Sequence, residues 1–247
     1  AYFDRWYAQM ETSPVKDAIQ RRHFGLPVEL GSAGVLPWDA VGEIATGLNL
    51  APGGLLVDVA CGRGGYGIEL ALRCNADLLG IDFSTVALDE ARRIAVRRLP
   101  EGRAAFQVAT LTSTDVPDAT ADALICTDSV QFADPPATAM AEFRRVLRSG
   151  GRLVLTTWRP TTPGDPRLGP RLRDLDPGGD LDAAGFRDIV VADRPHWRAA
   201  ERGMWEEAVA TSDDGRDLAL ASLRDEGRQS LAAFDSLERV IAFATAP

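Results

Sequence analysis

Short runs of hydrophobic residues alternate with longer amphipathic stretches through the middle of the chain. Apolar runs of this length are typical of strands buried on both faces, while the amphipathic stretches have the spacing of helices. The runs cover 55–59, 78–82, 104–108, 121–127 and 151–157, and the helical stretches cover 65–73, 84–98 and 135–148. Strands that alternate with helices predict a mainly parallel sheet wound on both sides, an α/β fold of the Rossmann-like kind.

The two ends of the chain depart from this alternation. Aromatic residues cluster in 2–20 on what would be one helical face, and a second helix is predicted for 38–48. Pro and Gly are frequent in 159–180, which predicts a connection or lid. Two more strands are expected at 186–194 and 237–246, with helical sequence between them. The chain therefore divides into an N-terminal helical cap, 1–50, a ligand-binding α/β core, 51–160, and a lid, insertion and final strand pair, 161–247.

Composition limits the kind of partner. The chain has 247 residues, 45% of them hydrophobic, and a formal net charge of −9. This acidity disfavours phosphate-rich partners, so we expect a small-molecule substrate, no nucleic acid and no membrane. Three cysteines and two histidines are too few and too scattered for a disulfide framework or a zinc site, so no metal is expected. With no apolar leader or spanning segment, we expect a cytoplasmic protein. The sequence leaves its oligomeric state open, and a homodimer is one possibility.

A glycine-rich loop follows the first predicted strand, in the stretch "LLVDVACGRGGYG". Ligands of such sheets lie beyond the carboxyl ends of the strands, and Gly62 and Gly64 stand just past this end. Glycines there let the backbone approach a ligand, and the next helix offers its N-terminal N–H groups. This spacing alone fits either NAD, and hence a nicotinamide oxidoreductase, or S-adenosylmethionine.

Two acidic residues narrow the choice of ligand. Asp82 ends the second strand at the same edge, where a carboxylate can accept hydrogen bonds from ribose hydroxyls, and Phe83 can lie against adenine. Asp82 could instead cap the helix that starts near Ser84. Asp58, inside the first strand, would repel a pyrophosphate but attract the ammonium and sulfonium groups of S-adenosylmethionine. The sulfonium cofactor is therefore favoured.

At this point the sequence resembles the class I S-adenosylmethionine-dependent methyltransferases, of the small-molecule, natural-product-like type. The stretch "VDVACGRGGYG" is similar to the first motif of that family, "LLGIDFS" to its second, and "RRVLRSGGRLVLTTW" to the helix, turn and strand that come later. The similarity covers about 35–160. It implies a seven-stranded sheet whose last strand is antiparallel, with a helical insertion before that strand, and S-adenosylhomocysteine as the product formed from the cofactor.

The resemblance also implies contacts with the cofactor. Asp58, Ala60, Gly62 and Gly64 would surround its methionyl and ribose parts, Asp82 would bind the ribose hydroxyls, and Phe83 would flank adenine. Cys126 and Thr127 would offer a carbonyl to the ammonium group. Relatives often carry an acid after the third strand that binds the adenine amino group, but Thr110 stands there in this chain, and Leu111 would supply a backbone N–H.

In relatives that act on small molecules, an aromatic cap and a late insertion often cover the substrate. Tyr2, Tyr7 and Trp38 would close over the cofactor here, with core packing as the alternative for Tyr7. The predicted acceptor contacts are Gln131, Phe132 and Trp158, with His196 nearby.

Methyl transfer from a sulfonium needs mainly the alignment of donor and acceptor in a dry site. A base is required only if the acceptor must lose a proton. His196 is the candidate base, with surface or packing roles as the alternative, and Asp128 is the second candidate. Two other functions stay open, a nicotinamide-dependent oxidoreductase and a cofactor-binding cyclase or other protein that does not methylate.

Overall fold

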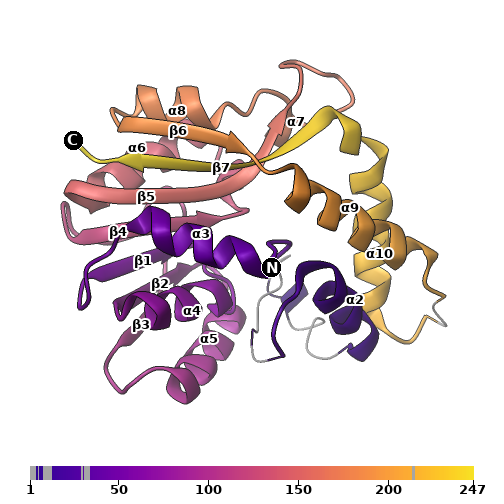
Figure 1. Ribbon diagram of the computed structural model, residues 1–247, viewed down its shortest axis with the longest axis horizontal. Coiled ribbons are helices and arrows are strands. Elements are labelled where there is room, and N and C mark those ends of the chain that lie inside the picture. The colour runs from indigo at the N-terminus through magenta and orange to yellow at the C-terminus, as the bar shows by residue number, and fades with distance from the viewer. Residues whose placement is uncertain (1–3, 5, 8–12, 29, 31–33, 213–214) are drawn as a thin grey trace.

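One seven-stranded sheet forms the centre of the molecule, in the order β3-β2-β1-β4-β5-β7-β6 (Figure 1). The computed structural model describes residues 4, 6–7, 13–28, 30, 34–212 and 215–247. The strands are β1 Leu55–Val59, β2 Asp77–Asp82, β3 Ala104–Val108, β4 Ala121–Thr127, β5 Leu147–Pro160, β6 Arg187–Asp193 and β7 Leu237–Thr245. Strands β1 to β5 pair in parallel, whereas β7 runs antiparallel to both β5 and β6. This confirms the predicted fold class and its antiparallel last strand.

Helices cover both faces of the sheet and create two cores. On one face lie α3 (Trp38–Leu48), α4 (Gly65–Cys74) and α5 (Thr85–Arg98), and on the other lie α6 (Pro136–Val146) and α8 (Pro177–Ala183). Ile44, Ile68 and Ile94 represent the first core, and Phe143 and Leu181 the second. Burial of apolar surface on both faces explains why the strands are nearly continuous hydrophobic runs.

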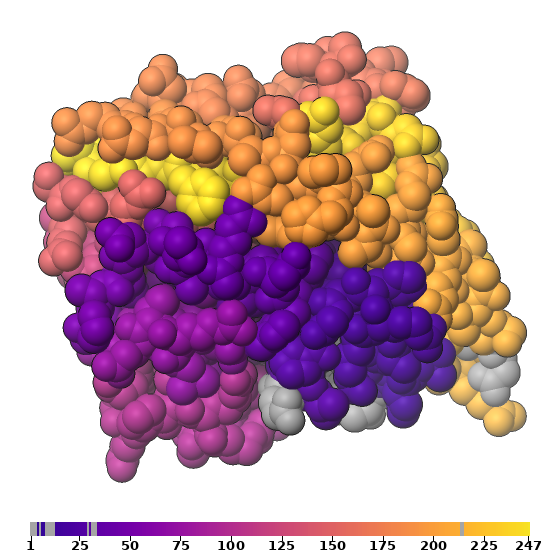
Figure 2. Space-filling view, in the orientation of Figure 1, coloured from indigo at the N-terminus to yellow at the C-terminus, as the bar shows by residue number. Residues whose placement is uncertain are grey.

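A third group of helices lies beyond the carboxyl ends of the parallel strands. It consists of α2 (Pro14–Phe24), α9 (Pro195–Ala210) and α10 (Leu218–Ala232), and the last two form the predicted insertion between β6 and β7. The side chains of His23 in α2 and Glu207 in α9 approach to 2.7 Å. In the space-filling view, α2 lies directly beside the α9–α10 pair at that end of the molecule (Figure 2).

Several boundaries differ from those expected. Strand β5 is longer than the predicted run because Leu147 already pairs with β4 and Pro160 still pairs with β7. The stretch 159–180, predicted as a connection or lid, contains the start of α8, where the Asp176 side chain accepts from the N–H of Gly179. Helix α3, assigned to the cap, contacts α4 and β5. The division of the chain at 50 and 160 stays a prediction.

Candidate functional site

The loop between β1 and α4 brings backbone, not side chains, to the carboxyl edge of the sheet. Gly62 and Gly64 have φ values of 53° and 73°, a left-handed conformation that glycine adopts at no steric cost. Ala60 shares this conformation with a φ of 59°. A Cβ atom on Gly62 would lie 2.6 Å from the Oη atom of Tyr7. The backbone of the loop can therefore be approached closely, and the Tyr7 side chain lies against it at Gly62.

Asp82 organises this loop from the neighbouring strand. Its Oδ2 atom accepts from the N–H of Gly62 at 2.9 Å and its Oδ1 atom from the N–H of Ser84 at 2.8 Å. Ser84, not Asp82, caps α5, because its hydroxyl accepts from the N–H of Ala87. The capping alternative for Asp82 is thus wrong. Burial raises the pKa of Asp82, although these backbone hydrogen bonds stabilise the ionised carboxylate and so lower the pKa in part.

Asp58 is a second buried acid beside the loop. The N–H of Gly67 donates to its carboxylate, but among the described residues Oδ1 has no hydrogen-bond partner. Burial, followed by the charge of Asp82, raises the pKa of Asp58 well above its usual value. A buried, unpaired carboxylate oxygen is costly unless a ligand satisfies it. Two acids at this loop fit a ligand that carries positive charge, as S-adenosylmethionine does, and oppose a pyrophosphate.

Gly67 is required by the position of Asp58. A Cβ atom at Gly67 would lie only 2.3 Å from the Oδ2 atom of Asp58, a distance that no real Cβ contact tolerates. We expect Gly67→Ala to push this carboxylate aside and to lower the free energy of unfolding by about 1–3 kcal/mol. Urea denaturation measures this change. The control is Gly42→Ala in α3, another helical glycine, where the nearest atom to an added Cβ is Nη1 of Arg73 at 3.8 Å, so that alanine fits without crowding. Equal stability losses in the two variants would contradict the steric explanation.

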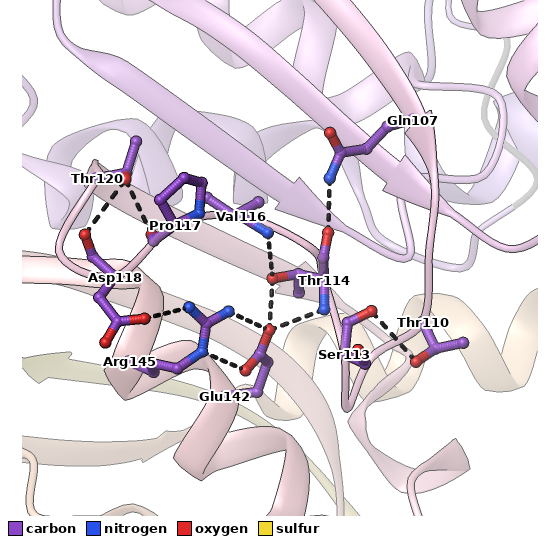
Figure 3. A network of polar contacts seen from close by, with 10 residues as sticks. All are labelled: Gln107, Thr110, Ser113, Thr114, Val116, Pro117, Asp118, Thr120, Glu142 and Arg145. Atoms are coloured by element: carbon purple, nitrogen blue, oxygen red, sulfur yellow. Dashed lines mark hydrogen bonds and ion pairs between the residues drawn. The ribbon is translucent and has the colours of Figure 1, made fainter.

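The loop after β3, where adenine contacts are predicted, is held by a polar network (Figure 3). Thr110 and Ser113 form an isolated bridge. Beyond them, Glu142 of α6 accepts from the N–H and the hydroxyl of Thr114, at 2.8 and 2.5 Å. Partial burial opposes ionisation, yet hydrogen bonds from Arg145 and Thr114 lower the pKa of Glu142 to about 2. The network fixes this loop without a carboxylate at Thr110.

The remaining predicted adenine contacts are Leu111, in that loop, and Phe83, directly after β2. Leu111 packs against the second core, while Phe83 is 48% exposed at the end of β2. Their roles toward adenine stay predictions.

The end of β4 leads to the predicted acceptor side. Cys126 is fully buried, and burial raises the pKa of its thiol. The carbonyl of Thr127 accepts from the Ser129 hydroxyl at 2.9 Å, which leaves one lone pair for a ligand. Gln131 is buried in the short helix η1 (Val130–Phe132), where its amide donates to the carbonyl of Asp128 at 2.7 Å. Phe132 is 43% exposed, below the guanidinium of Arg171.

A cluster of charged side chains is buried behind this edge, between β4, β7 and α9. Arg239 is fully buried, and its Nη2 atom donates to Oδ2 of Asp128 at 2.6 Å. Its Nε atom lies 3.4 Å from Oε2 of Glu201. The Trp158 ring lies 4.1 Å from the guanidinium carbon and its indole N–H donates to Glu201. Trp158, a predicted acceptor contact, is thus held by two charged residues.

Sequence reasoning missed Arg239 and Glu201. Arg239 stands near the start of β7, between Glu238 and the apolar run 240–244. Glu201 lies four residues after Trp197 and four before Trp205, on one face of α9, and all three are buried. A charged residue at the centre of an apolar helical face is the signal that could have identified Glu201.

Glu201 couples stability to pH. Burial raises the pKa of Glu201 to about 7. The charge of Arg239 and the indole N–H groups of Trp205 and Trp158 oppose this shift. A raised carboxyl pKa makes the ionised form destabilising, so the free energy of unfolding falls as pH rises from the ordinary value near 4.5 to about 7. Between pH 5 and pH 8, we expect the free energy of unfolding of the wild type to fall by roughly 2 kcal/mol more than that of Glu201→Gln. Urea denaturation at the two pH values measures this difference. A difference that does not vary with pH would contradict this.

The predicted cap and base residues lie in different surroundings. Burial, then the charge of Asp82, raises the pKa of the Tyr7 phenol. Trp38 begins α3, and the guanidinium of Arg73 lies 4.6 Å from its ring. The His196 side chain is 59% exposed, with Nε2 3.2 Å from Oδ2 of Asp39. Tyr2 lies outside the described residues.

For the described residues, a metal site would require clustered ligand side chains, and a membrane span would require a long apolar helix. In this part of the chain, no group of three or more His, Cys, Asp or Glu side chains is arranged to hold a metal ion. None of the helices described is both long and apolar enough to cross a bilayer.

Known proteins share this fold and part of this sequence. Residues 57–155 match the family model Methyltransf_11, described as a methyltransferase domain. Phosphoethanolamine N-methyltransferase 3 of Arabidopsis thaliana is 28% identical over 212 residues, 76% of this chain and 42% of that protein. The chain thus spans about two fifths of the length of that curated relative.

Solved structures give the same fold at low identity. The cyclase SpnF has a TM-score of 0.70 at 23% identity, over 85% of this chain and 80% of that chain. Geranyl diphosphate C-methyltransferase from Streptomyces coelicolor, solved with S-adenosyl-L-homocysteine, has a TM-score of 0.67 at 18% identity, over 96% and 99% of the two chains. The family match over 57–155 and the fold both agree with the resemblance to the class I S-adenosylmethionine-dependent methyltransferases. S-adenosyl-L-homocysteine, the product expected from the predicted cofactor, is a ligand in the geranyl diphosphate C-methyltransferase structure.

Proposed function

We propose that this protein transfers the methyl group of S-adenosylmethionine to an oxygen, nitrogen or carbon atom of a small molecule, in the biosynthesis of a natural product. The observation that supports this most is the buried carboxylate of Asp58, whose Oδ1 atom has no hydrogen-bond partner among the described residues. It lies beside a glycine loop within the segment that matches a methyltransferase domain. A cofactor with an ammonium group supplies the missing donor.

The chain's own residues then have separate tasks. Asp82 holds the loop by accepting a hydrogen bond from the N–H of Gly62, and it also accepts hydrogen bonds from the ribose hydroxyls of the cofactor. Asp58 orders the surroundings of the cofactor's amino group. When bound, the cofactor would supply a methyl group attached to a positively charged sulfur, and after transfer this sulfur is part of a neutral thioether. The helices α2, α9 and α10 lie beyond the carboxyl edge of the sheet. There they would limit the access of water, which would favour alignment of the reacting groups.

A base is needed in this reaction only if the acceptor must lose a proton. His196 stays the predicted base and Asp128 its alternative. Asp128 already accepts from the Thr156 hydroxyl at 2.7 Å and from Arg239, and His196 is exposed beside Asp39. These contacts favour an acceptor that needs no strong base.

The same contacts also support a second candidate, a protein that binds the cofactor and does not methylate. The cyclase SpnF has this fold. In this case the cofactor would shape the site, and S-adenosylhomocysteine would not be formed.

Native mass spectrometry of the purified protein, followed by transfer of a labelled methyl group, separates the two candidates. We expect S-adenosylmethionine or S-adenosylhomocysteine to co-purify, and label to pass to one class of acceptor in a panel of phenols, amines and prenyl alcohols. Bound cofactor without transfer to any acceptor would favour the second candidate. Preferential binding of NAD would contradict both.

A further inference from the structure

The buried charged cluster, formed by Asp128, Arg239 and Glu201, contains one cation between two acids. The side chains of Arg239 and Glu201 are 0% and 3% exposed, and that of Asp128 is 10% exposed. The two carboxyl groups approach the guanidinium from different elements, Asp128 from the end of β4 and Glu201 from α9. Water therefore screens these charges weakly.

The sum of these charges is not positive as long as Asp128 is ionised. With both acids ionised the cluster carries a net charge of −1, and with Glu201 protonated it is neutral. An arginine at the edge of a site often marks the binding of a phosphate or carboxylate. Here the positive charge is already offset by groups of the chain itself.

The cluster adjoins the residues predicted to contact the acceptor. Trp158 lies against Arg239 and donates to Glu201, and Gln131 donates to the carbonyl of Asp128. Nη1 of Arg239 is buried and has no hydrogen-bond partner in the described part of the chain. A neutral oxygen could accept from it without bringing another negative charge.

We propose that the cluster of Asp128, Arg239 and Glu201 determines specificity by rejecting anionic acceptors, so that the substrate presents a neutral or cationic face to Trp158 and Gln131. This inference rests on the proposed function, because it assumes that these two residues face the acceptor. A phosphate or carboxylate would be a further negative group around a single guanidinium, and like charges repel strongly where water is excluded. Arg171, above Phe132, is solvent-exposed, so its charge is screened and does not reverse this preference.

The test uses pairs of acceptors that differ mainly in an anionic group. The full chain is given methyl-labelled S-adenosylmethionine with ethanolamine or phosphoethanolamine, catechol or protocatechuate, and geraniol or geranyl diphosphate. We expect transfer only to members without the anionic group, or a kcat/KM at least about tenfold higher for them. Equal or better transfer to an anionic member would overturn the proposal.

Variants connect the preference to the cluster. At pH 8.5, where Glu201 is ionised, Glu201→Gln and Asp128→Asn each remove one negative charge, and we expect each to reduce the preference about tenfold, mainly through KM for the anionic member. The control is Glu206→Gln on the same helix, because Glu206 is exposed and its contact is a surface ion pair with Arg202 at 3.7 Å. We expect the control to keep the wild-type preference.

Affinity for S-adenosylhomocysteine, measured in parallel, shows that each variant is folded. A preference that stays unchanged in both cluster variants, with this affinity retained, would overturn the assignment to the cluster. Transfer to no acceptor, with S-adenosylhomocysteine still bound, contradicts the proposed function, and the specificity proposal falls with it.

Discussion

Asp82→Ala is expected to weaken S-adenosylhomocysteine binding at least about 100-fold, because the substitution removes the carboxylate that shapes the glycine loop. The N–H groups of Gly62 and Ser84 both donate to this side chain. Hydrogen bonds to a charged group contribute about 1.5–3 kcal/mol each, and the predicted ribose contacts are lost as well. Isothermal titration calorimetry with S-adenosylhomocysteine measures the effect without an acceptor.

The control for Asp82→Ala is Asp89→Ala on α5. The Asp89 side chain is 65% exposed and pairs with Arg92 on the surface, so the control should bind S-adenosylhomocysteine like the wild type. Asp82→Asn should give an intermediate loss, since an amide keeps the shape but can accept through only one of its two terminal atoms. A folded Asp82→Ala protein with unchanged affinity would contradict the role assigned to Asp82.

Arg239→Met is expected to cause the largest loss of stability, about 3–5 kcal/mol, because it leaves Asp128 and Glu201 as buried acids without their shared cation. Guanidinium chloride denaturation at pH 8 measures the free energy of unfolding. For a chain of this size the melting temperature should fall by roughly 10 °C.

A second substitution separates unpaired charge from lost packing. Adding Glu201→Gln and Asp128→Asn to Arg239→Met removes the uncompensated acids, so the triple variant should regain part of the lost stability. Arg228→Met, at a half-exposed arginine of α10 paired with Asp225, should change stability by less than about 1 kcal/mol. If Arg239→Met were as stable as Arg228→Met, the buried cluster would not have the electrostatic role described.

The sheet and the cofactor edge were predictable because their signals are local in the sequence. Strands β1, β3 and β4 lie where the apolar runs were found. Asp58 and Asp82 could be placed near one another because they belong to adjacent parallel strands that end at the same edge. The glycines between them mark the turn, so residue type and spacing together located the loop.

The acceptor side was less predictable because its contacts join distant parts of the chain. Asp128 and Arg239 are 111 residues apart, and Trp158 and Glu201 are 43 apart. No local pattern indicates which arginine meets which acid across β7 and α9. Helix α8 was missed for another reason: it is seven residues long and begins in a stretch rich in Pro and Gly.

Calorimetric titration of the full chain with S-adenosylhomocysteine, S-adenosylmethionine and NAD tests the central claim most directly. The two acids at the glycine loop, one with an unpaired buried oxygen, predict binding of both sulfur-containing ligands and no detectable binding of NAD. Asp58→Asn should weaken binding of the sulfur-containing ligands, because it removes the charge that we propose lies near their ammonium group. Binding of NAD with neither sulfur ligand bound, or equal affinity in wild type and Asp58→Asn, would contradict the account.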